Sequence, residues 1–268
     1  MVRADYEIGL VLFVGSPLLY RRMFDALLHS MDQCGGDVRV HVAETGMPDP
    51  GLYENPFFAI NTRKLAIWRD MAWGAQRPIV LLDTDMLVLR PLVDAFADFE
   101  GEVGITVRPD GLLNAGAVYL RPGEAAQGFM DRWCEVNDAL FEHEFELMAW
   151  QEKQPGMNQP ALRKLLDQGE PVCELPCWKW NCMDSCWRDF QLGETGVLHL
   201  KGALRRCVFD GGPVPRGADM AAMVGRWFAQ PGAQSFPVAS ANEAADEAAD
   251  GGRDESLGVV SLPQEAAV

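Results

Sequence analysis

The first half of the chain alternates short apolar runs with amphipathic stretches, and this alternation constrains the fold more than any other feature. Residues 8–14 form a continuous apolar run that ends at Gly-Ser-Pro, as expected of a buried strand. Leu19, Met23 and Leu27 then recur every four residues, which predicts one apolar face of a helix. Residues 38–42 alternate in polarity and predict a second strand. A strand, a helix and a strand in this order favour a parallel pair and an α/β fold.

The same kind of pattern continues along the chain. Further strands are predicted over residues 78–82, 86–89, 103–107, 115–120 and 197–200, and helices over residues 61–72, 126–140 and 160–166. Ser16 is expected to cap the first helix, with Pro17 at the first helical position.

Composition limits the classes of function. The chain has 268 residues, of which 48% are hydrophobic, so it can bury one sizeable core. Its formal net charge of -16 argues against a nucleic-acid partner and an anionic membrane surface, because both are bound through lysine and arginine. An acidic protein that binds a phosphorylated ligand must offset the repulsion locally, with a metal ion or a few placed cations.

Part of this acidity lies at the C-terminal end. Residues 241–268 hold seven acidic residues and one arginine, a charge of -6 that leaves -10 for the rest of the chain. Low hydrophobicity and high charge are typical of disorder. We therefore expect one folded domain over residues 1–230 and an acidic, disordered tail over residues 231–268; a helical tail that docks on the domain is the alternative.

The cysteines and the lack of long apolar runs bear on location. No run approaches the ~20 apolar residues of a membrane span, and no export signal is recognisable, so a reducing cytoplasm is expected. Cys173, Cys177, Cys182 and Cys186 lie close enough in sequence to make a tetrahedral zinc site. Their spacing is unusual for zinc, however, so buried, reduced thiols are the preferred interpretation.

Asp83-Thr84-Asp85 closes the apolar run of residues 78–82. Aspartate oxygens are ligands for hard divalent cations, and open α/β sheets bind ligands at the carboxyl ends of their strands. Alone, such a triplet is more often a solvated turn. Phosphatases of the haloacid-dehalogenase type also carry Asp-x-Asp after a strand, but Leu87 stands where they normally have Thr or Val, and the triplet lies far into the chain for that class.

Blocks on both sides of the triplet change its interpretation. They occur in order at residues 62–68, 78–92, 113–122, 158–162, 175–181 and 199–205. Together they resemble glycosyltransferase family 8, the glycogenin-like nucleotide-sugar transferases, over roughly residues 8–206. The resemblance implies the GT-A fold, a single α/β domain with a mixed, mostly parallel central sheet.

The resemblance also implies a site. Its metal ligands would be Asp83, Asp85 and His199, and a ligand set with one imidazole suits Mn²⁺ somewhat better than Mg²⁺. Contacts with the nucleotide, the diphosphate or the sugar are implied for a larger set: Phe13, Val14, Gly15, Ser16, Lys64, Asp83, Thr84, Asn114, Ala115, Lys201, Gly202 and Arg205.

The activity implied is the metal-dependent transfer of a hexose from a nucleoside-diphosphate sugar, expected to be a UDP-sugar, to an unidentified acceptor with retention of configuration. Asn158 and Gln159 would lie near the reacting carbon, and Asp184 or Asp189 is the first candidate for a general base if the reaction inverts. Asn158 stands where the family has Asp, Arg205 where it has Lys, and the Pro-Trp that follows that Lys is absent. A non-catalytic nucleotide-sugar-binding protein is therefore the main alternative.

Overall fold

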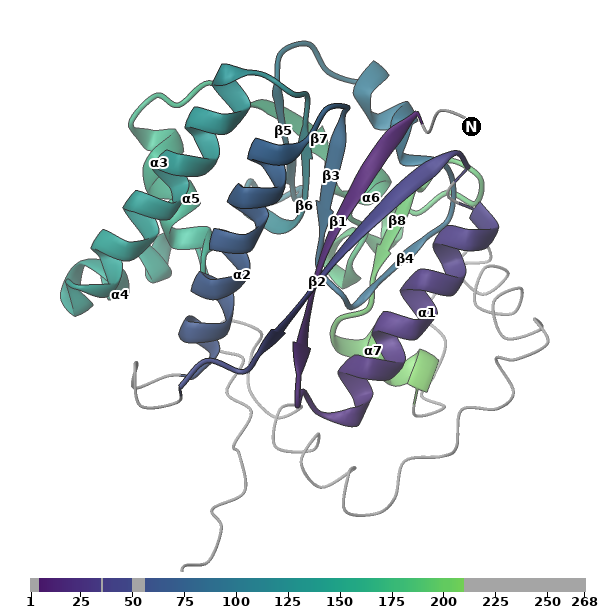
Figure 1. The fold of residues 1–268 in the computed structure, drawn as a ribbon, viewed down its shortest axis with the longest axis horizontal. Helices are drawn as coiled ribbons and strands as arrows, with labels where there is room; N and C mark the ends of the chain where they lie inside the picture. Colours follow the sequence, from purple (N-terminus) through teal and green to yellow (C-terminus); the bar gives the residue numbers. More distant parts are fainter. Residues whose placement is uncertain (1–4, 35, 50–55, 210–268) are drawn as a thin grey trace, which may run out of the picture.

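The computed structural model describes residues 5–34, 36–49 and 56–209. A central six-stranded sheet, in the order β2-β1-β3-β6-β5-β7, runs between two sets of helices (Figure 1). The predicted domain boundary after residue 230 and the predicted acidic tail lie outside the described residues. Among the helices that are described, none is both long and apolar enough to cross a bilayer.

The first part of the sheet is parallel. β1 (Tyr6–Val14) lies between β2 (Val38–Gly46) and β3 (Ile79–Leu82) and runs parallel to both. All of β1 is buried except its last residue, Val14, because neighbours cover it on both edges and both faces. This burial explains the continuous apolar run in the sequence, and it confirms the expected parallel pair.

The second part of the sheet contains one strand of opposite direction. β6 (Leu113–Leu120) is antiparallel to β3 on one side and to β5 (Val103–Val107) on the other. β7 (Cys173–Pro176) then runs parallel to β5. Since β6 alone opposes the other five strands, the sheet is mixed and mostly parallel, and the predicted fold class is confirmed.

A separate two-stranded sheet joins distant parts of the sequence. β4 (Met86–Val88) pairs antiparallel with β8 (Val197–His199), and Met86 lies opposite His199. The backbone N–H of Leu200 also donates to the carbonyl of Asp85, at 2.7 Å. The pairing therefore holds the end of β8 beside the residues that follow β3.

Helices cover both faces of the central sheet (Figure 1). One face carries α2 (Pro56–Gly74), α3 (Glu124–Phe141), α4 (Glu144–Lys153) and α5 (Gln159–Asp167). Trp68 of α2 and Trp133 of α3 are fully buried in the apolar cluster on this side. α1 (Leu18–Cys34) packs on the other side against β4, and its Leu27 shares a cluster with Tyr6.

The second half of the chain holds elements that the sequence did not predict. They are α4, β7, α6 (Cys177–Trp180), the 3₁₀ helix η3 (Asp184–Asp189) and α7 (Gly202–Phe209); a further 3₁₀ helix, η2 (Leu92–Ala97), follows β4. The start of α1 also differs from the prediction. The Ser16 hydroxyl donates to the carbonyl of Phe13 at 2.8 Å, which closes the turn after β1, and the helix begins at Leu18, after Pro17.

Candidate metal and diphosphate site

Three potential ligands converge where β3, β4 and β8 meet. Asp83 follows β3, Asp85 precedes β4, and His199 ends β8. One ligand atom from each lies within 4.8 Å of the others. The fold therefore brings together the three residues that the sequence predicted as metal ligands.

His199 has one engaged and one open ring nitrogen. The ring is fully buried, and its Nδ1 lies 2.9 Å from Oδ1 of Asn181. Its Nε2 lies 3.2 Å from Oδ1 of Asp85, but the geometry makes no hydrogen bond there or to any other described residue. A buried ring nitrogen between two carboxylates is a donor set that fits a divalent cation such as Mn²⁺ or Mg²⁺.

Asp85 is held in its ionised form. Burial raises the pKa of this carboxyl, but the His199 ring and the positive charges of Lys201 and Arg205 outweigh burial and hold the pKa below its usual value. Nη2 of Arg205 lies 3.6 Å from Oδ2 of Asp85. A carboxylate that stays charged at neutral pH is ready to bind a metal ion without first releasing a proton.

Cations surround the two carboxylates. Nζ of Lys64 lies 2.5 Å from Oδ1 of Asp83 and 4.4 Å from the centre of the Trp68 ring. Lys201 and Arg205 lie close enough to Asp85 to lower the pKa of its carboxyl. Three positive side chains thus accompany two negative ones in a protein of net charge -16. Such a region attracts a diphosphate, and more strongly once a divalent cation is added.

Gly116 of β6 leaves the space in which this cluster sits. Its carbonyl accepts a hydrogen bond from the backbone N–H of Asp83 at 2.8 Å. A Cβ at this position would lie 2.6 Å from Cε of Met86 and 2.7 Å from Cε1 of His199. Both distances are shorter than van der Waals contact, so the imidazole can occupy its place only because residue 116 has no side chain.

The carboxyl end of β1 exposes backbone and apolar surface. Gly15 has a φ of 92°, a conformation that L residues rarely adopt, and the exposed fraction of Val14 is 58%. A Cβ on Gly15 would lie 3.7 Å from Cγ of Met47, itself 43% exposed after β2. Of the predicted nucleotide contacts in this region, Val14 and Gly15 therefore lie at an accessible edge, whereas Phe13 is buried.

Asn114 and Ala115, predicted to contact the sugar, are buried in β6. The amide nitrogen of Asn114 lies 2.9 Å from Sδ of Met183, and its Oδ1 accepts from the backbone N–H of Gly116. Thr84 lies between the two aspartates, and Gly202 begins α7 with a φ of 49°. Their contacts with a substrate stay predictions.

The three predicted catalytic residues lie outside the ligand cluster. Asn158 precedes α5 and is 2% exposed, and its side-chain nitrogen has no hydrogen-bond partner among the residues described. Oε1 of Gln159 accepts from the backbone N–H of Met157. Asp184 begins η3. Their catalytic roles also stay predictions.

The sequence did not predict a role for two buried polar residues behind His199. Asn181 follows α6, and its Nδ2 donates to Oγ1 of Thr106 at 2.9 Å and to the carbonyl of Asn114 at 3.3 Å. Oγ1 of Thr106 donates to the same carbonyl at 2.7 Å. Asn181 lies in a block that resembles the family, but only the folded chain places it against the histidine.

The four cysteines do not form the alternative zinc site. Within the described ranges, the group of Asp83, Asp85 and His199 is the one set of three or more suitable ligands that converges. Cys177, Cys182 and Cys186 are buried in an apolar cluster, whereas Cys173 bonds to the carbonyl of Glu100.

Comparison with known proteins supports the fold. No protein-family model and no curated protein sequence matches the chain. Among solved structures, a glycosyltransferase involved in glycosylation of the major capsid of PBCV-1 matches with a TM-score of 0.55 and 12% identity, over 75% of this chain and 96% of that one.

Two further structures of glycosyltransferases match over more of this chain. GlyE of Streptococcus pneumoniae TIGR4 has a TM-score of 0.52 and 14% identity, over 89% of this chain and 66% of that one. The galactosyltransferase LgtC, solved with donor and acceptor sugar analogues, has a TM-score of 0.50 and 14% identity, over 89% of this chain and 99% of that one. These likenesses show that the chain has the GT-A glycosyltransferase fold.

Proposed function

We propose that the protein is a metal-dependent glycosyltransferase that moves a hexose from a nucleoside-diphosphate sugar, most simply a UDP-sugar, to an acceptor with retention of configuration. The observation that carries the proposal is the convergence of Asp83, Asp85 and the open Nε2 of His199 within 4.8 Å, at the carboxyl end of β3 in a GT-A fold. Membership of glycosyltransferase family 8 is part of the proposal.

The proposed metal ion, Mn²⁺ or Mg²⁺, would be held by Asp83, Asp85 and His199. When bound, it would neutralise charge on the diphosphate as the bond to the sugar breaks. Lys201 and Arg205 lie next to Asp85 and would bind the remaining phosphate oxygens. The planar guanidinium of Arg205 can bind two such oxygens at once, so an arginine serves well where the family has a lysine.

The nucleotide would lie at the carboxyl end of β1. Exposed Val14, Leu18 and Met47 offer apolar surface there for a base or a ribose. Gly15 allows the backbone to approach the ligand closely. Apolar surface that is exposed in the free protein and covered in the complex would contribute to binding in proportion to its area.

The reaction needs an acceptor hydroxyl to replace the diphosphate at the anomeric carbon. In a retaining reaction the leaving diphosphate takes the electron pair of the broken C–O bond, and one of its oxygens accepts the proton of the hydroxyl. We place Asn158 and Gln159, at the start of α5, on the sugar side. Asp184 is the candidate base for the inverting alternative.

The central experiment is turnover with a panel of nucleotide sugars in the presence of Mn²⁺. We expect release of a nucleoside diphosphate, loss of release on chelation with EDTA, and loss of release in Asp85→Ala. Asp131→Ala is the matched control, because Asp131 lies on α3, its side chain is 38% exposed, and its polar contacts are with Trp73 and Arg69 of α2. Equal release by wild type and Asp85→Ala would contradict the metal assignment.

Two other functions make different predictions in the same experiment. A non-catalytic nucleotide-sugar-binding protein would bind the donor in a Mn²⁺-dependent way and release nothing with any acceptor. A phosphatase of the haloacid-dehalogenase type would release phosphate from an aryl phosphate and lose that activity in Asp83→Asn.

A further inference from the structure

We propose that Asn181 is a positioning residue for the metal site, because it fixes which nitrogen of His199 carries the proton. The inference rests on the metal-dependent function proposed above. It concerns a residue that would touch neither the metal ion nor the substrate. Both side chains are fully buried, so no solvent competes for their contact.

The orientation of the Asn181 amide follows from its neighbours. One end of the amide faces the carbonyl oxygen of Asn114 at 3.3 Å and Oγ1 of Thr106 at 2.9 Å. The carbonyl can only accept, and Thr106 already donates its proton to that carbonyl at 2.7 Å. The end that faces them must therefore be the NH₂ group, and Oδ1 must face Nδ1 of His199 at 2.9 Å.

This orientation decides the state of the imidazole. Nδ1 of His199 has two polar neighbours, Oδ1 of Asn181 at 2.9 Å and the amide nitrogen of Asn114 at 3.5 Å. The shorter contact is with an acceptor, and the Asn114 amide is also engaged with Sδ of Met183 at 2.9 Å, so Nδ1 carries the hydrogen. In the neutral ring Nε2 then has no hydrogen and carries a lone pair, and it lies 3.2 Å from Oδ1 of Asp85. Two electron-rich atoms so close together and buried need a cation between them, either a proton or a metal ion. A divalent ion binds the lone pair directly, so the tautomer held by Asn181 is the one that can ligate.

The chain holds Asn181 in place on two sides. Its N–H donates to the carbonyl of Cys177 at 2.8 Å, and its own carbonyl accepts from Sγ of the same residue. The preceding residue, Trp180, donates from its indole to Asp98 at 2.7 Å. Its ring also lies so close to Gly196 that a Cβ there would come within 2.5 Å of it.

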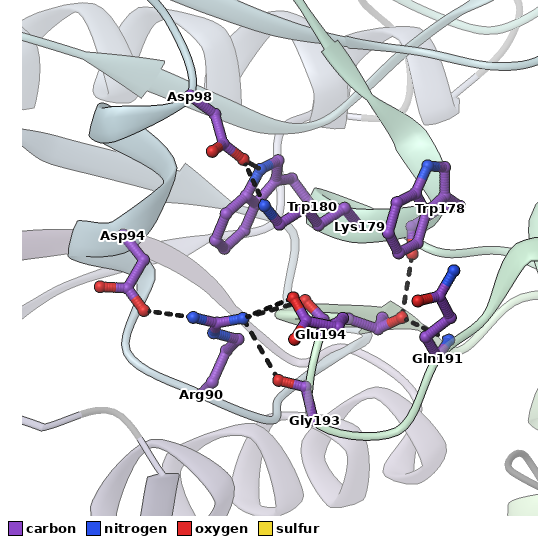
Figure 2. A network of polar contacts seen from close by, with 10 residues as sticks. Arg90, Asp94, Asp98, Trp178, Lys179, Trp180, Gln191, Gly193 and Glu194 are labelled. Atoms are coloured by element: carbon purple, nitrogen blue, oxygen red, sulfur yellow. Dashed lines mark hydrogen bonds and ion pairs between the residues drawn. The ribbon is translucent and has the colours of Figure 1, made fainter.

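A network of polar contacts supports the segment around Trp180. Figure 2 shows Asp98 joined to both Lys179 and Trp180, and Arg90 reaching from Asp94 to the loop at Glu194. The guanidinium of Arg90 lies 5.9 Å from the centre of the Trp180 ring. These contacts fix the segment that ends at Asn181, and they limit how far its side chain can move from His199.

Strands β5 and β6 of the central sheet supply the other hydrogen-bond partners of Asn181. The β5–β6 pairing shifts register between Ile105 and Thr106, and this irregularity accompanies the contact of Thr106 with the Asn114 carbonyl. The result is one connected set of hydrogen bonds from β5 and β6 through Asn181 to His199. Every member that faces Asn181 is at least nine-tenths buried, as expected where a precise geometry is held.

The first test observes the proton itself in the unaltered protein. The chain has four histidines, so ¹⁵N-labelled histidine in untagged full-length protein gives few ring signals, and the signal lost in His199→Gln is that of residue 199. We expect the proton to stay on Nδ1 of His199 at every pH at which the protein is folded. A ring that keeps its proton on Nε2 alone would overturn the proposal.

The second test measures Mn²⁺ binding by the loss of the free-ion EPR signal. Asn181→Ala should weaken binding by about 10- to 100-fold, the usual effect of removing a partner of a metal-bound histidine. Asn181→Asp should largely restore it, because a carboxylate also accepts from Nδ1. Its melting temperature should nevertheless fall, because the carboxylate cannot donate to Thr106 and Asn114.

Asn137→Ala is the matched control for a buried asparagine. Asn137 is 2% exposed and donates to Oγ1 of Thr62 at 3.0 Å, so its removal should cost stability and leave the Mn²⁺ affinity unchanged. Equal Mn²⁺ affinity in wild type and Asn181→Ala would overturn the positioning role alone. Failure of the wild type to bind Mn²⁺ would instead contradict the proposed metal-dependent function. The NMR measurement would still show which ring nitrogen of His199 carries the proton.

Discussion

Nζ of Lys64 lies 2.5 Å from Oδ1 of Asp83, while the same ammonium group rests 4.4 Å from the centre of the Trp68 ring. Both side chains are largely buried, with exposed fractions of 12% for Lys64 and 20% for Asp83. Lys64 would therefore compete with a bound metal ion for the carboxylate oxygens of Asp83. It also supplies a positive charge that a diphosphate would meet.

This relationship predicts opposite effects on metal and on nucleotide. Lys64→Met should bind Mn²⁺ alone more tightly, because Asp83 loses a competing cation; an effect of about 1–2 kcal/mol corresponds to roughly 5- to 30-fold. The same variant should bind Mn²⁺ with a nucleoside diphosphate more weakly. Isothermal titration calorimetry measures both, with exposed Arg63→Met on the same helix as the control. Weaker binding of Mn²⁺ alone would contradict the competition.

A side chain at position 116 should damage the site and the fold together. In Gly116→Ala the new methyl group would overlap Met86 and His199, and such overpacking costs about 1–3 kcal/mol. Urea unfolding should show this loss, and Mn²⁺ affinity should fall as the ring is displaced. Gly74→Ala is the control, since a Cβ there meets nothing within 4 Å. Unchanged Mn²⁺ affinity in Gly116→Ala would show that the absence of a side chain at position 116 is not needed for metal binding.

The exposed apolar surface at the end of β1 should contribute to nucleotide affinity and not to the stability of the fold. Val14→Ser removes apolar surface that is 58% exposed in the free protein, so the melting temperature should change little. If a base or ribose covers this surface, about 1 kcal/mol of binding is lost, or roughly fivefold in nucleotide affinity. Phe145→Ser, at an 88% exposed position on α4, is the matched control. Equal loss in both variants would count against a nucleotide at this edge.

The contact between Asp98 and α6 predicts a pH dependence of stability. Burial raises the pKa of Asp98, but hydrogen bonds from Lys179 and Trp180 outweigh it, so the folded-state pKa is below the ordinary aspartate value of about 4. The group therefore stabilises the fold above that value, and the contribution is lost as the pH falls below it.

Asp98→Asn should lower the free energy of unfolding at pH 7 and remove part of its decline between pH 5 and pH 3. Urea unfolding of both proteins across this range measures the difference. Parallel curves for the wild type and the variant would show that Asp98 does not contribute to the acid sensitivity.

The elements that the sequence predicted share a simple physical cause. β1, β3 and β6 are covered on both faces, so their residues are mainly apolar, with Glu7 in β1 and Asn114 in β6 as buried polar exceptions. α3 buries one face, so its apolar residues recur with helical spacing. The triplet of residues 83–85 could be placed at a strand end by the same reasoning. Its partner His199 became a candidate through the resemblance, and the β4–β8 pairing brings the two together.

The elements that were missed lack such a pattern. α4 buries Leu147 but leaves Phe145 and Met148 exposed, so its apolar residues do not mark one face. β7 is as short as β3 but has mixed polarity and buries only Leu175, so it lacks the continuous apolar run that marked β3. Asn181 could not be assigned a role, because its hydrogen bonds reach residues far away in the sequence.

The pairing of β4 with β8 also determines when the proposed metal centre can form. Two carboxylates are made early in synthesis, and the imidazole arrives only after most of the described chain has been translated. Neither a nascent chain nor a fragment that stops before β8 has a complete coordination sphere. Tight uptake of the proposed ion would therefore be a property of the finished fold, and it would report that the chain has folded completely.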